Sequence, residues 1–301
     1  MTNPYERLAG IFPMLFAFFD PEDRLDRDAM RRQVETLIGW KVHGLAVLGL
    51  ATEVNKLSLP ERLTLLEWVS EDNAGRLPLA VTVAEPSVPG QIEFAQAAAE
   101  AGAEWIILQP PPVHGIDETQ LIDFFGAVAS SVNIPVGLQL APEFLGSDLS
   151  AGGLNELGRR HPNVTHLKVE MTPLAIEELI ERTDDRFTVF NGRAGLEMVD
   201  SIDAGCSGII PGAECADRLA RIYDDLRIGS AEARAKAESE YAAIAGLIGF
   251  LFASLDTFLL YGKILAGRRF GIETAAPRRP HRHSSTFGLS LLERHARLLL
   301  E

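Results

Sequence analysis

The sequence predicts a (β/α)8 TIM barrel with a C-terminal helical appendage, and three observations lead to this prediction. Short apolar runs alternate with longer amphipathic stretches, which is the pattern of strands and helices in a parallel sheet. Eight such runs occur before residue 213, within the length of ~250 residues that a barrel of this kind needs. The remainder of the 301-residue chain contains no strand-like run and is typical of helices.

The expected strands are apolar on both faces, as in a parallel sheet that is covered by helices. They lie at 11–18, 44–48, 79–83, 105–108, 136–140, 164–168, 187–190 and 208–210. Apolar residues at helical spacing predict the helices between them. These lie at 28–41, 59–73, 89–101, 118–132, 149–161, 173–182 and 194–204. A doubly wound open sheet is the structural alternative, but an early G-x-G-x-x-G after the first strand is missing.

The C-terminal part of the sequence predicts three helices, at 231–248, 249–266 and 289–301. Pro277 and Pro280 interrupt the helical pattern before the last of them. We therefore divide the chain into a catalytic barrel, 1–225, and a helical region, 226–301, that packs on it. The apolar faces of this region are also suited to subunit contacts.

Composition narrows the class of protein. The formal charge of −14 disfavours binding to nucleic acid and to anionic membranes. The longest apolar stretch, 242–260, contains Ser254 and Asp256 and suits a buried helix better than a membrane span. Cys206 and Cys215 have neither CxxC spacing nor a neighbouring His pair, which argues against a metal site and a disulfide framework. Because the first ten residues also lack a signal-peptide pattern, we expect a cytoplasmic protein.

Lys168 is the most informative residue of the chain. It ends the apolar run V-T-H-L-K at 164–168, whereas the other four lysines lie in polar or helical stretches typical of solvated side chains. The C-terminal ends of barrel strands form the active sites of these folds. A desolvated lysine there can lose its proton and attack a carbonyl to form a Schiff base. The alternative is a strand-end lysine whose ammonium group simply reaches water.

The loop after the second strand is a candidate substrate site, formed by Gly49, Leu50, Ala51, Thr52 and Glu53. Free backbone N–H groups in a loop that begins with glycine can bind a carboxylate, and Thr52 adds a hydroxyl group. Glu53 has three interpretations: it orients the loop, acts as an acid, or braces the loop as a structural carboxylate.

Other strand ends add further candidates. Gln139 ends strand five and can position a carbonyl group or a water molecule, but it cannot transfer a proton. Gly192 follows strand seven, Ile210 ends strand eight, and a glycine permits close approach of a ligand to the backbone. Arg193 is either an anion contact or a partner in a surface salt bridge. The seven histidines show no metal-ligand grouping, so we expect no metal ion.

Several motifs, in order and at suitable spacing, make the chain similar to the dihydrodipicolinate synthase / N-acetylneuraminate lyase family of class I aldolases. The run G-L-A-V-L-G-L-A-T-E at 44–53 resembles the family's G-[LV]-x-x-x-G-[ST]-T-G-E loop. The run L-S-L-P-E-R at 57–62 matches the L-[ST]-x-x-E-[RK] that follows it. Lys168 occupies the position of the Schiff-base lysine, and G-C-S-G-I-I-P at 205–211 resembles the strand-eight segment.

The resemblance implies a Schiff-base lyase (an aldolase, dehydratase or deaminase) that acts on a small 2-keto acid such as pyruvate. It implies covalent chemistry through Lys168 without a separate cofactor. The loop 49–53 would hold the substrate carboxylate, and Gln139 would stand where the family has its strand-five tyrosine. Relatives are usually tetramers built from dimers, so we expect a homo-oligomer.

The departures from the family pattern are equally informative. Gln139 replaces the strand-five tyrosine of the family, and the proline run 110–112 replaces a strand-four region that supplies a second tyrosine. The arginine that follows strand five in dihydrodipicolinate synthases has no counterpart in 143–146. We therefore expect that the chain is not a working dihydrodipicolinate synthase. Phe18, Leu140 and Phe190 predict an apolar pocket. A catalytically impaired barrel that binds a ligand or regulates a partner is the alternative. A metal-dependent class II aldolase is poorly supported, because the sequence shows no cluster of metal ligands.

Overall fold

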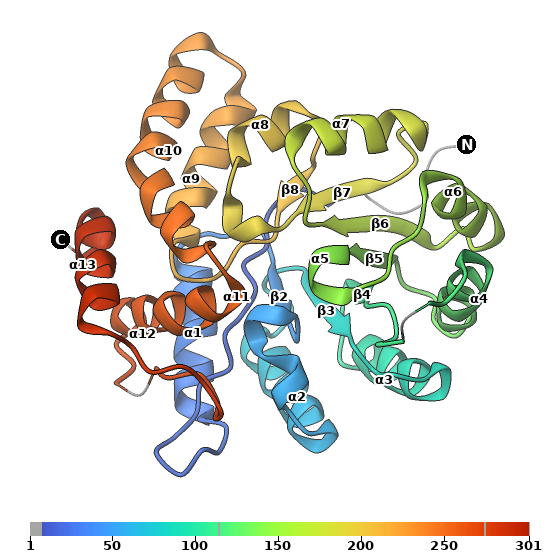
Figure 1. The fold of residues 1–301 in the computed structure, drawn as a ribbon, viewed down its shortest axis with the longest axis horizontal. Helices are drawn as coiled ribbons and strands as arrows, with labels where there is room; N and C mark the ends of the chain where they lie inside the picture. The colour runs from blue at the N-terminus through green and yellow to red at the C-terminus, as the bar shows by residue number, and fades with distance from the viewer. Residues whose placement is uncertain (1–7, 114, 274, 301) are drawn as a thin grey trace.

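A closed barrel of parallel strands forms the centre of the molecule (Figure 1). This computed structural model describes residues 8–113, 115–273 and 275–300. The strands are hydrogen-bonded in the order β1-β8-β7-β6-β5-β4-β3-β2. They are β1 (Gly10–Ile11), β2 (Leu45–Val47), β3 (Leu79–Val83), β4 (Trp105–Leu108), β5 (Val136–Leu140), β6 (Val164–Val169), β7 (Thr188–Asn191) and β8 (Gly208–Ile209). The predicted (β/α)8 barrel is confirmed.

The segment after β1 closes the ring between β8 and β2. Met14 forms parallel bridges to Ala46 on one side and Gly212 on the other. The N–H of Leu15 donates to the carbonyl of Ala46 at 2.8 Å. The sequence predicts one strand over 11–18, but only its first part pairs regularly because the chain crosses from one neighbour to the other. At the β1–β8 contact, a Cβ atom on Gly208 would lie 2.0 Å from the carbonyl oxygen of Gly10, so the close approach requires glycine.

Helices surround the strands. They are α1 (Arg27–Gly39), α2 (Leu59–Asn73), α3 (Val88–Glu100), α4 (Glu118–Ala129), the short α5 (Pro142–Leu145), α6 (Ala151–Arg160), α7 (Pro173–Arg182), α8 (Met198–Asp203) and α9 (Ala216–Ile228). Side chains cap several of their N-termini; Ser58, for example, forms a reciprocal capping box with Glu61. The prediction of one helix over 194–204 is wrong at its start, because Ala194 and Glu197 adopt left-handed backbone conformations that delay α8 to Met198.

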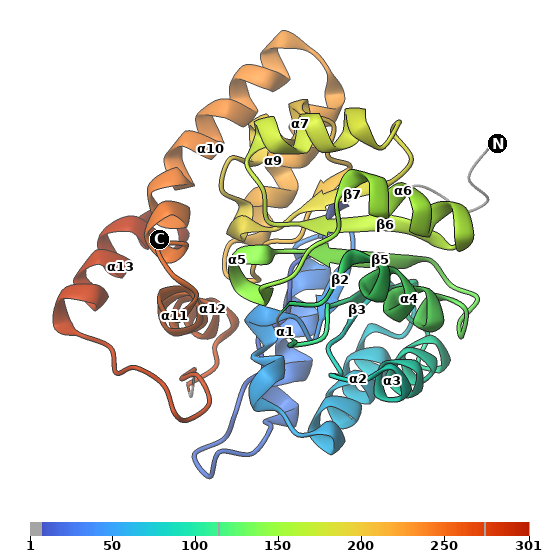
Figure 2. The ribbon, with the colours of Figure 1, turned by 45° about the vertical axis from the view of Figure 1, so that its right-hand side comes forward.

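The C-terminal region lies on one side of the barrel in both views (Figures 1 and 2). It contains α10 (Ala231–Leu251), α11 (Leu255–Thr257), a π-helical turn η4 (Phe258–Gly262), α12 (Lys263–Phe270) and α13 (Thr286–Leu300). The predicted start at residue 249 is wrong because α10 continues to Leu251 and Ser254 caps a new helix. Among the described residues no single helix is long and apolar enough to cross a membrane, and only a pair bent by 108°, Ala231–Leu251 with Leu255–Phe270, meets that test together.

Aromatic side chains fill the interior of the barrel. Trp105 stacks on His166 with ring centroids 4.8 Å apart and on Phe190 at 5.5 Å. All three residues are completely buried. Removal from water lowers the pKa of His166 to about 4, because the charged imidazolium is not solvated there. His166 is therefore a neutral core residue beneath the barrel mouth.

Replacing this histidine should make stability less sensitive to acid. A group whose pKa is 6.5 unfolded and about 4 folded contributes fully above pH 6.5 and loses its contribution as pH falls toward 4. A change of that size corresponds to about 3 kcal/mol. We expect His166→Gln to flatten the fall in the free energy of unfolding between these pH values, as measured by urea denaturation. The exposed His283→Gln should leave the slope unchanged, and an unchanged slope in His166→Gln would contradict the assignment.

Candidate active site

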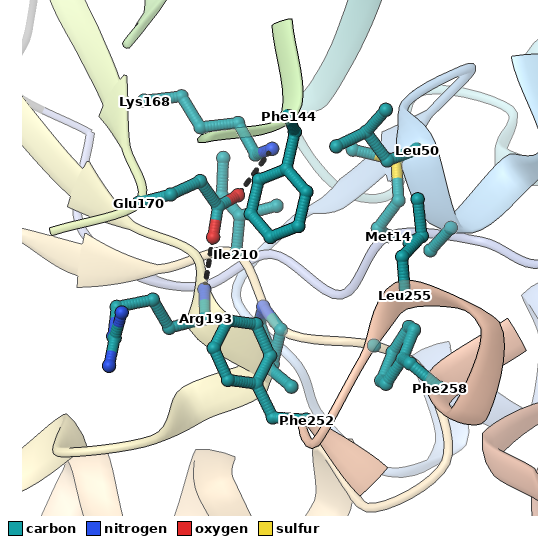
Figure 3. Close-up of a pocket in the computed structure, with 14 residues that line it drawn as sticks. Met14, Leu50, Phe144, Lys168, Glu170, Arg193, Ile210, Phe252, Leu255 and Phe258 are labelled. Atoms are coloured by element: carbon teal, nitrogen blue, oxygen red, sulfur yellow. Dashed lines mark hydrogen bonds and ion pairs between the residues drawn. The ribbon is translucent and has the colours of Figure 1, made fainter. Parts of the chain in front are cut away.

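Lys168 lies near the C-terminal end of β6, and its side chain enters a pocket at the barrel mouth (Figure 3). Only 5 % of that side chain is exposed. The pocket has an empty volume of about 510 Å³, including a part open to solvent. Its lining residues are Met14, Leu50, Ala51, Phe144, Lys168, Glu170, Arg193, Ala194, Ile210, Pro211, Gly212, Phe252, Leu255 and Phe258.

Glu170 is the direct partner of Lys168. Lys168 Nζ donates to Glu170 Oε1 at 3.1 Å, and the glutamate side chain is 9 % exposed (Figure 3). Alternate residues of a strand point to the same side, so the spacing of two brings both groups into one pocket. The mutual neutralisation lowers the cost of removing both charges from water. The pocket thus presents an amine beside a group that can accept and return a proton.

The segment after β7 fixes the position of this carboxylate. The backbone N–H of Arg193 donates to Glu170 Oε2. A Cβ atom on Gly192 would lie 2.2 Å from Glu170 Oε1, so the absence of a side chain at Gly192 makes room for the carboxylate. Gly192, expected to contact substrate, lies behind Glu170 and does not line the pocket, whereas Ile210 does.

The loop after β2 forms a 3₁₀ turn, η1 (Leu50–Thr52), on the other side of the pocket. Leu50 and Ala51 line the pocket. Within the described part of the chain, their N–H groups donate to no other protein group, as expected at the start of a helical turn. Gly49 does not line the pocket; its N–H contacts Met14 Sδ at 3.3 Å. Two of the five loop residues expected to bind substrate therefore face the pocket.

Thr52 and Glu53 point away from the pocket, which corrects the expectation of side-chain contacts from them. Thr52 Oγ1 donates to the carbonyl of Leu15 at 2.6 Å and accepts the N–H of Leu48 at 3.0 Å. Glu53 is completely buried and accepts hydrogen bonds from Lys263 Nζ at 2.7 Å and Lys56 Nζ at 2.9 Å. The bracing interpretation of Glu53 is therefore the one that its geometry supports.

Lys263 was expected in solvent but is completely buried. Desolvation lowers the pKa of its ammonium group to about 8, although the neighbouring Glu53 opposes the shift. Its Nζ also lies 4.6 Å from the centre of the Phe19 ring. The backbone N–H of Arg278 donates to Glu53 as well, at 3.0 Å. The C-terminal region is thereby joined to the base of the pocket loop.

Gln139 lies beside Lys168 in the β5–β6 pairing but does not line the pocket. Its Oε1 accepts a hydrogen bond from Gln109 Nε2 at 3.0 Å, and only 1 % of the residue is exposed. Phe18, Leu140 and Phe190, expected to make the pocket apolar, are buried in the core and do not line it either. The expectation that these three side chains make the pocket apolar is therefore wrong.

Other apolar residues form the pocket wall. Phe144 comes from α5, Phe252 follows α10, Leu255 lies in α11 and Phe258 begins η4. Figure 3 shows Phe144 beside Lys168 and the other three on the side of the C-terminal region. None of these four was expected in the site, because they come from α5 and from the C-terminal region and not from the strand ends. Glu170 was also missed, although its spacing of two from Lys168 is a signal that the sequence contains.

Comparisons relate this chain to known proteins. The sequence profile described as the dihydrodipicolinate synthetase family matches residues 7–279. A 4-hydroxy-tetrahydrodipicolinate synthase of Xanthomonas axonopodis pv. citri is 31 % identical over 246 residues, which cover 80 % of this chain and 81 % of that protein. The L-2-keto-3-deoxyarabonate dehydratase of Azospirillum brasilense is 28 % identical over 230 residues, 74 % of each chain.

A solved structure shows the same fold. YagE from E. coli K12, a member of the dihydrodipicolinic acid synthase family determined in complex with pyruvate, superimposes with a TM-score of 0.89. The match covers 98 % of this chain and 99 % of that chain at 22 % sequence identity, so it bears on the fold alone.

Breaking the buried ion pair between Glu53 and Lys263 should destabilise the protein strongly. Glu53→Gln leaves Lys263 buried without its anion, a loss that typically costs about 3–5 kcal/mol. Adding Lys263→Met removes the stranded amine, so we expect the double variant to recover part of the free energy of unfolding, as measured by denaturant titration. Glu178→Gln breaks a pair whose side chains are 62–66 % exposed and should cost less than about 1 kcal/mol. Equal losses in Glu53→Gln and Glu178→Gln would refute the bracing role.

Proposed function

Because the chain belongs to the dihydrodipicolinate synthetase family, we propose that it is a Schiff-base lyase of the aldolase type acting on a small 2-keto acid, pyruvate or a derivative of it. The observation that carries this proposal is the amine of Lys168, which lies 3.1 Å from Glu170 in a pocket at the barrel mouth while only 5 % of its side chain is exposed. No separate cofactor is needed in this proposal, because the covalent bond to Lys168 provides the electron sink.

Lys168 acts as the nucleophile. Its neutral amine attacks the 2-carbonyl carbon, and loss of water from the adduct gives an iminium ion. For this step the ammonium form must give up a proton, and Glu170 Oε1 is placed to receive it. Glu170 then passes that proton to the hydroxyl of the adduct, which leaves as water, so that Glu170 is a carboxylate again when the iminium has formed. In the free protein the hydrogen bond thus keeps a proton acceptor within reach of the amine.

Glu170 then transfers the protons of the cleavage step. In a 4-hydroxy-2-keto acid bound as the iminium, the carboxylate removes the proton of the C4 hydroxyl and the C3–C4 bond breaks. The electron pair of that bond moves into the iminium to give an enamine, and an aldehyde leaves. Glu170 returns its proton to C3, and water hydrolyses the new iminium to free pyruvate and Lys168. Glu170 thus takes over a task that Gln139, a neutral amide, cannot perform.

The 3₁₀ turn of the β2 loop supplies the carboxylate site in this proposal. Leu50 and Ala51 line the pocket and begin the turn, and their N–H groups have no hydrogen-bond acceptor among the residues that the structure describes. Backbone N–H groups in such a turn attract anions. Thr52 and Glu53 contribute by holding the turn in place.

A different reaction from that of dihydrodipicolinate synthases follows from the replaced residues. The family's strand-five tyrosine position is Gln139, a neutral amide whose Oε1 accepts from Gln109 and whose buried Nε2 has no hydrogen-bond partner among the described residues. No arginine follows strand five at 143–146. We therefore place this chain among the members that act on other keto acids.

Trapping with borohydride tests the nucleophile. We expect pyruvate and borohydride to add one reduced pyruvyl group to the wild-type protein, located at Lys168 by peptide mass spectrometry. Lys168→Arg should give no adduct, whereas the surface substitution Lys236→Arg should give as much as wild type. An adduct on a different lysine, or none in wild type, would refute the proposal. An adduct without turnover of any keto acid would favour a ligand-binding barrel.

Exchange of the pyruvate methyl protons tests Glu170. In D2O the wild-type protein should exchange these protons through the enamine, as followed by NMR. Loss of a positioned acid–base group typically lowers such a rate about 10²–10⁴-fold. We expect that loss in Glu170→Gln, with partial recovery in Glu170→Asp and with the borohydride adduct still formed. Glu143→Gln, outside the pocket lining, is the matched control; full exchange by Glu170→Gln would exclude the carboxylate from this role.

A further inference from the structure

We propose that the preferred substrate is a 2-keto acid with a single carboxylate whose chain beyond C4 is alkyl or aryl, in contrast to the polyhydroxylated chain of a sugar acid. This inference rests on the proposed Schiff-base function and names its substrate class. It follows from the side chains that the pocket offers and from the charges that are already paired.

The pocket lining is poor in groups that recognise hydroxyls. Of the fourteen lining residues, only Lys168, Glu170 and Arg193 have polar side chains. In the proposed function Lys168 forms the covalent bond to the substrate, and Glu170 contacts the C4 hydroxyl group. Leu50 and Ala51 stand where the family pattern expects hydroxyl-bearing residues. A substrate with hydroxyls at C5 and C6 therefore finds few partners among the described side chains.

The cations of the pocket lining are paired as well. Lys168 faces Glu170, and Arg193 Nε lies within ion-pair distance of Glu197 Oε2, at 3.2 Å, without a hydrogen bond between them. The guanidinium of Arg193 also stacks over the Phe252 ring at 5.2 Å. A second substrate carboxylate would have to compete with these internal partners. The substrate carboxylate therefore has one natural position, the β2 loop.

The apolar part of the pocket lining fits an apolar group. Phe144, Phe252, Leu255 and Phe258 come together from α5 and the C-terminal region (Figure 3). Phe258 is 7 % exposed and packs on Phe16 with ring centroids 5.6 Å apart, so the position of its ring is fixed by this contact. Burying an alkyl or aryl group on this wall removes apolar surface from water on both sides.

A hydroxylated chain would be at a disadvantage on the same wall. A hydroxyl that leaves water without gaining a partner weakens binding by about 10- to 100-fold. An alkyl chain of the same length meets no such penalty. The discrimination is therefore expected to appear in binding, before any bond is cleaved.

The test compares two keto acids with the same carbon skeleton. These are 4-hydroxy-2-oxohexanoate and 4,5,6-trihydroxy-2-oxohexanoate. We measure the concentration of each that gives half-maximal borohydride-trapped adduct at Lys168, a reading that does not require turnover. We expect the first compound to trap at a concentration at least about tenfold lower. Equal concentrations, or a preference for the trihydroxy compound, would overturn the inference.

Pocket variants show whether the wall is responsible. Leu255→Ser and Phe144→Tyr introduce hydroxyl groups into the pocket lining, and each should shift the ratio about tenfold toward the trihydroxy compound. Leu174→Ser changes a leucine that is 78 % exposed and outside the pocket, and it should leave the ratio unchanged. An unchanged ratio in both pocket variants would show that these apolar side chains do not determine the preference.

The same assay separates the two proposals. Pyruvate alone is trapped at Lys168 if the Schiff-base function is correct, whatever the ratio for the longer keto acids. Absence of a pyruvate adduct overturns the proposed function, whereas a pyruvate adduct with an inverted ratio overturns only the substrate class.

Discussion

The hydrogen bond between Lys168 and Glu170 is the constraint around which the barrel mouth is arranged. Both side chains are more than nine-tenths buried, and neither charge would be tolerated there without the other. The strand β6 brings them to one side, Gly192 leaves space for the carboxylate, and the N–H of Arg193 holds its second oxygen. An amine and a proton acceptor are thus kept at bonding distance in a wall that is otherwise largely apolar.

A second buried lysine–glutamate pair has a different consequence. Lys263 and Glu53 are both completely buried, and neither lines the pocket. The charge of Glu53 is used in fixing the loop that carries Leu50 and Ala51. The two pairs contain the same chemical groups, but only Lys168 and Glu170 meet a cavity that a substrate can enter. Access to that cavity, and not residue type, distinguishes the two pairs.

The parts of the fold and site that depend on local sequence could be predicted. Runs of apolar residues placed β3, β4 and β5 correctly, and the cation at the end of such a run marked Lys168. The direction of Glu53 could not be predicted, because its left-handed backbone and a lysine 210 residues away decide it. The positions of Phe144 and Phe252 could not be predicted either, because they depend on how α5 and the segment after α10 pack over the barrel. Glu170 could have been found, since alternation along a strand places it beside Lys168.

The helical region after the barrel contributes to the candidate active site. Phe252, Leu255 and Phe258 line the pocket, while Lys263 and Arg278 hold the loop that carries Leu50 and Ala51. A barrel without this region would keep the lysine but lose both the apolar wall and the brace of its carboxylate site. In the proposed function the strands therefore supply the nucleophile, and the C-terminal helices supply the side chains that would contact the carbon chain of the substrate.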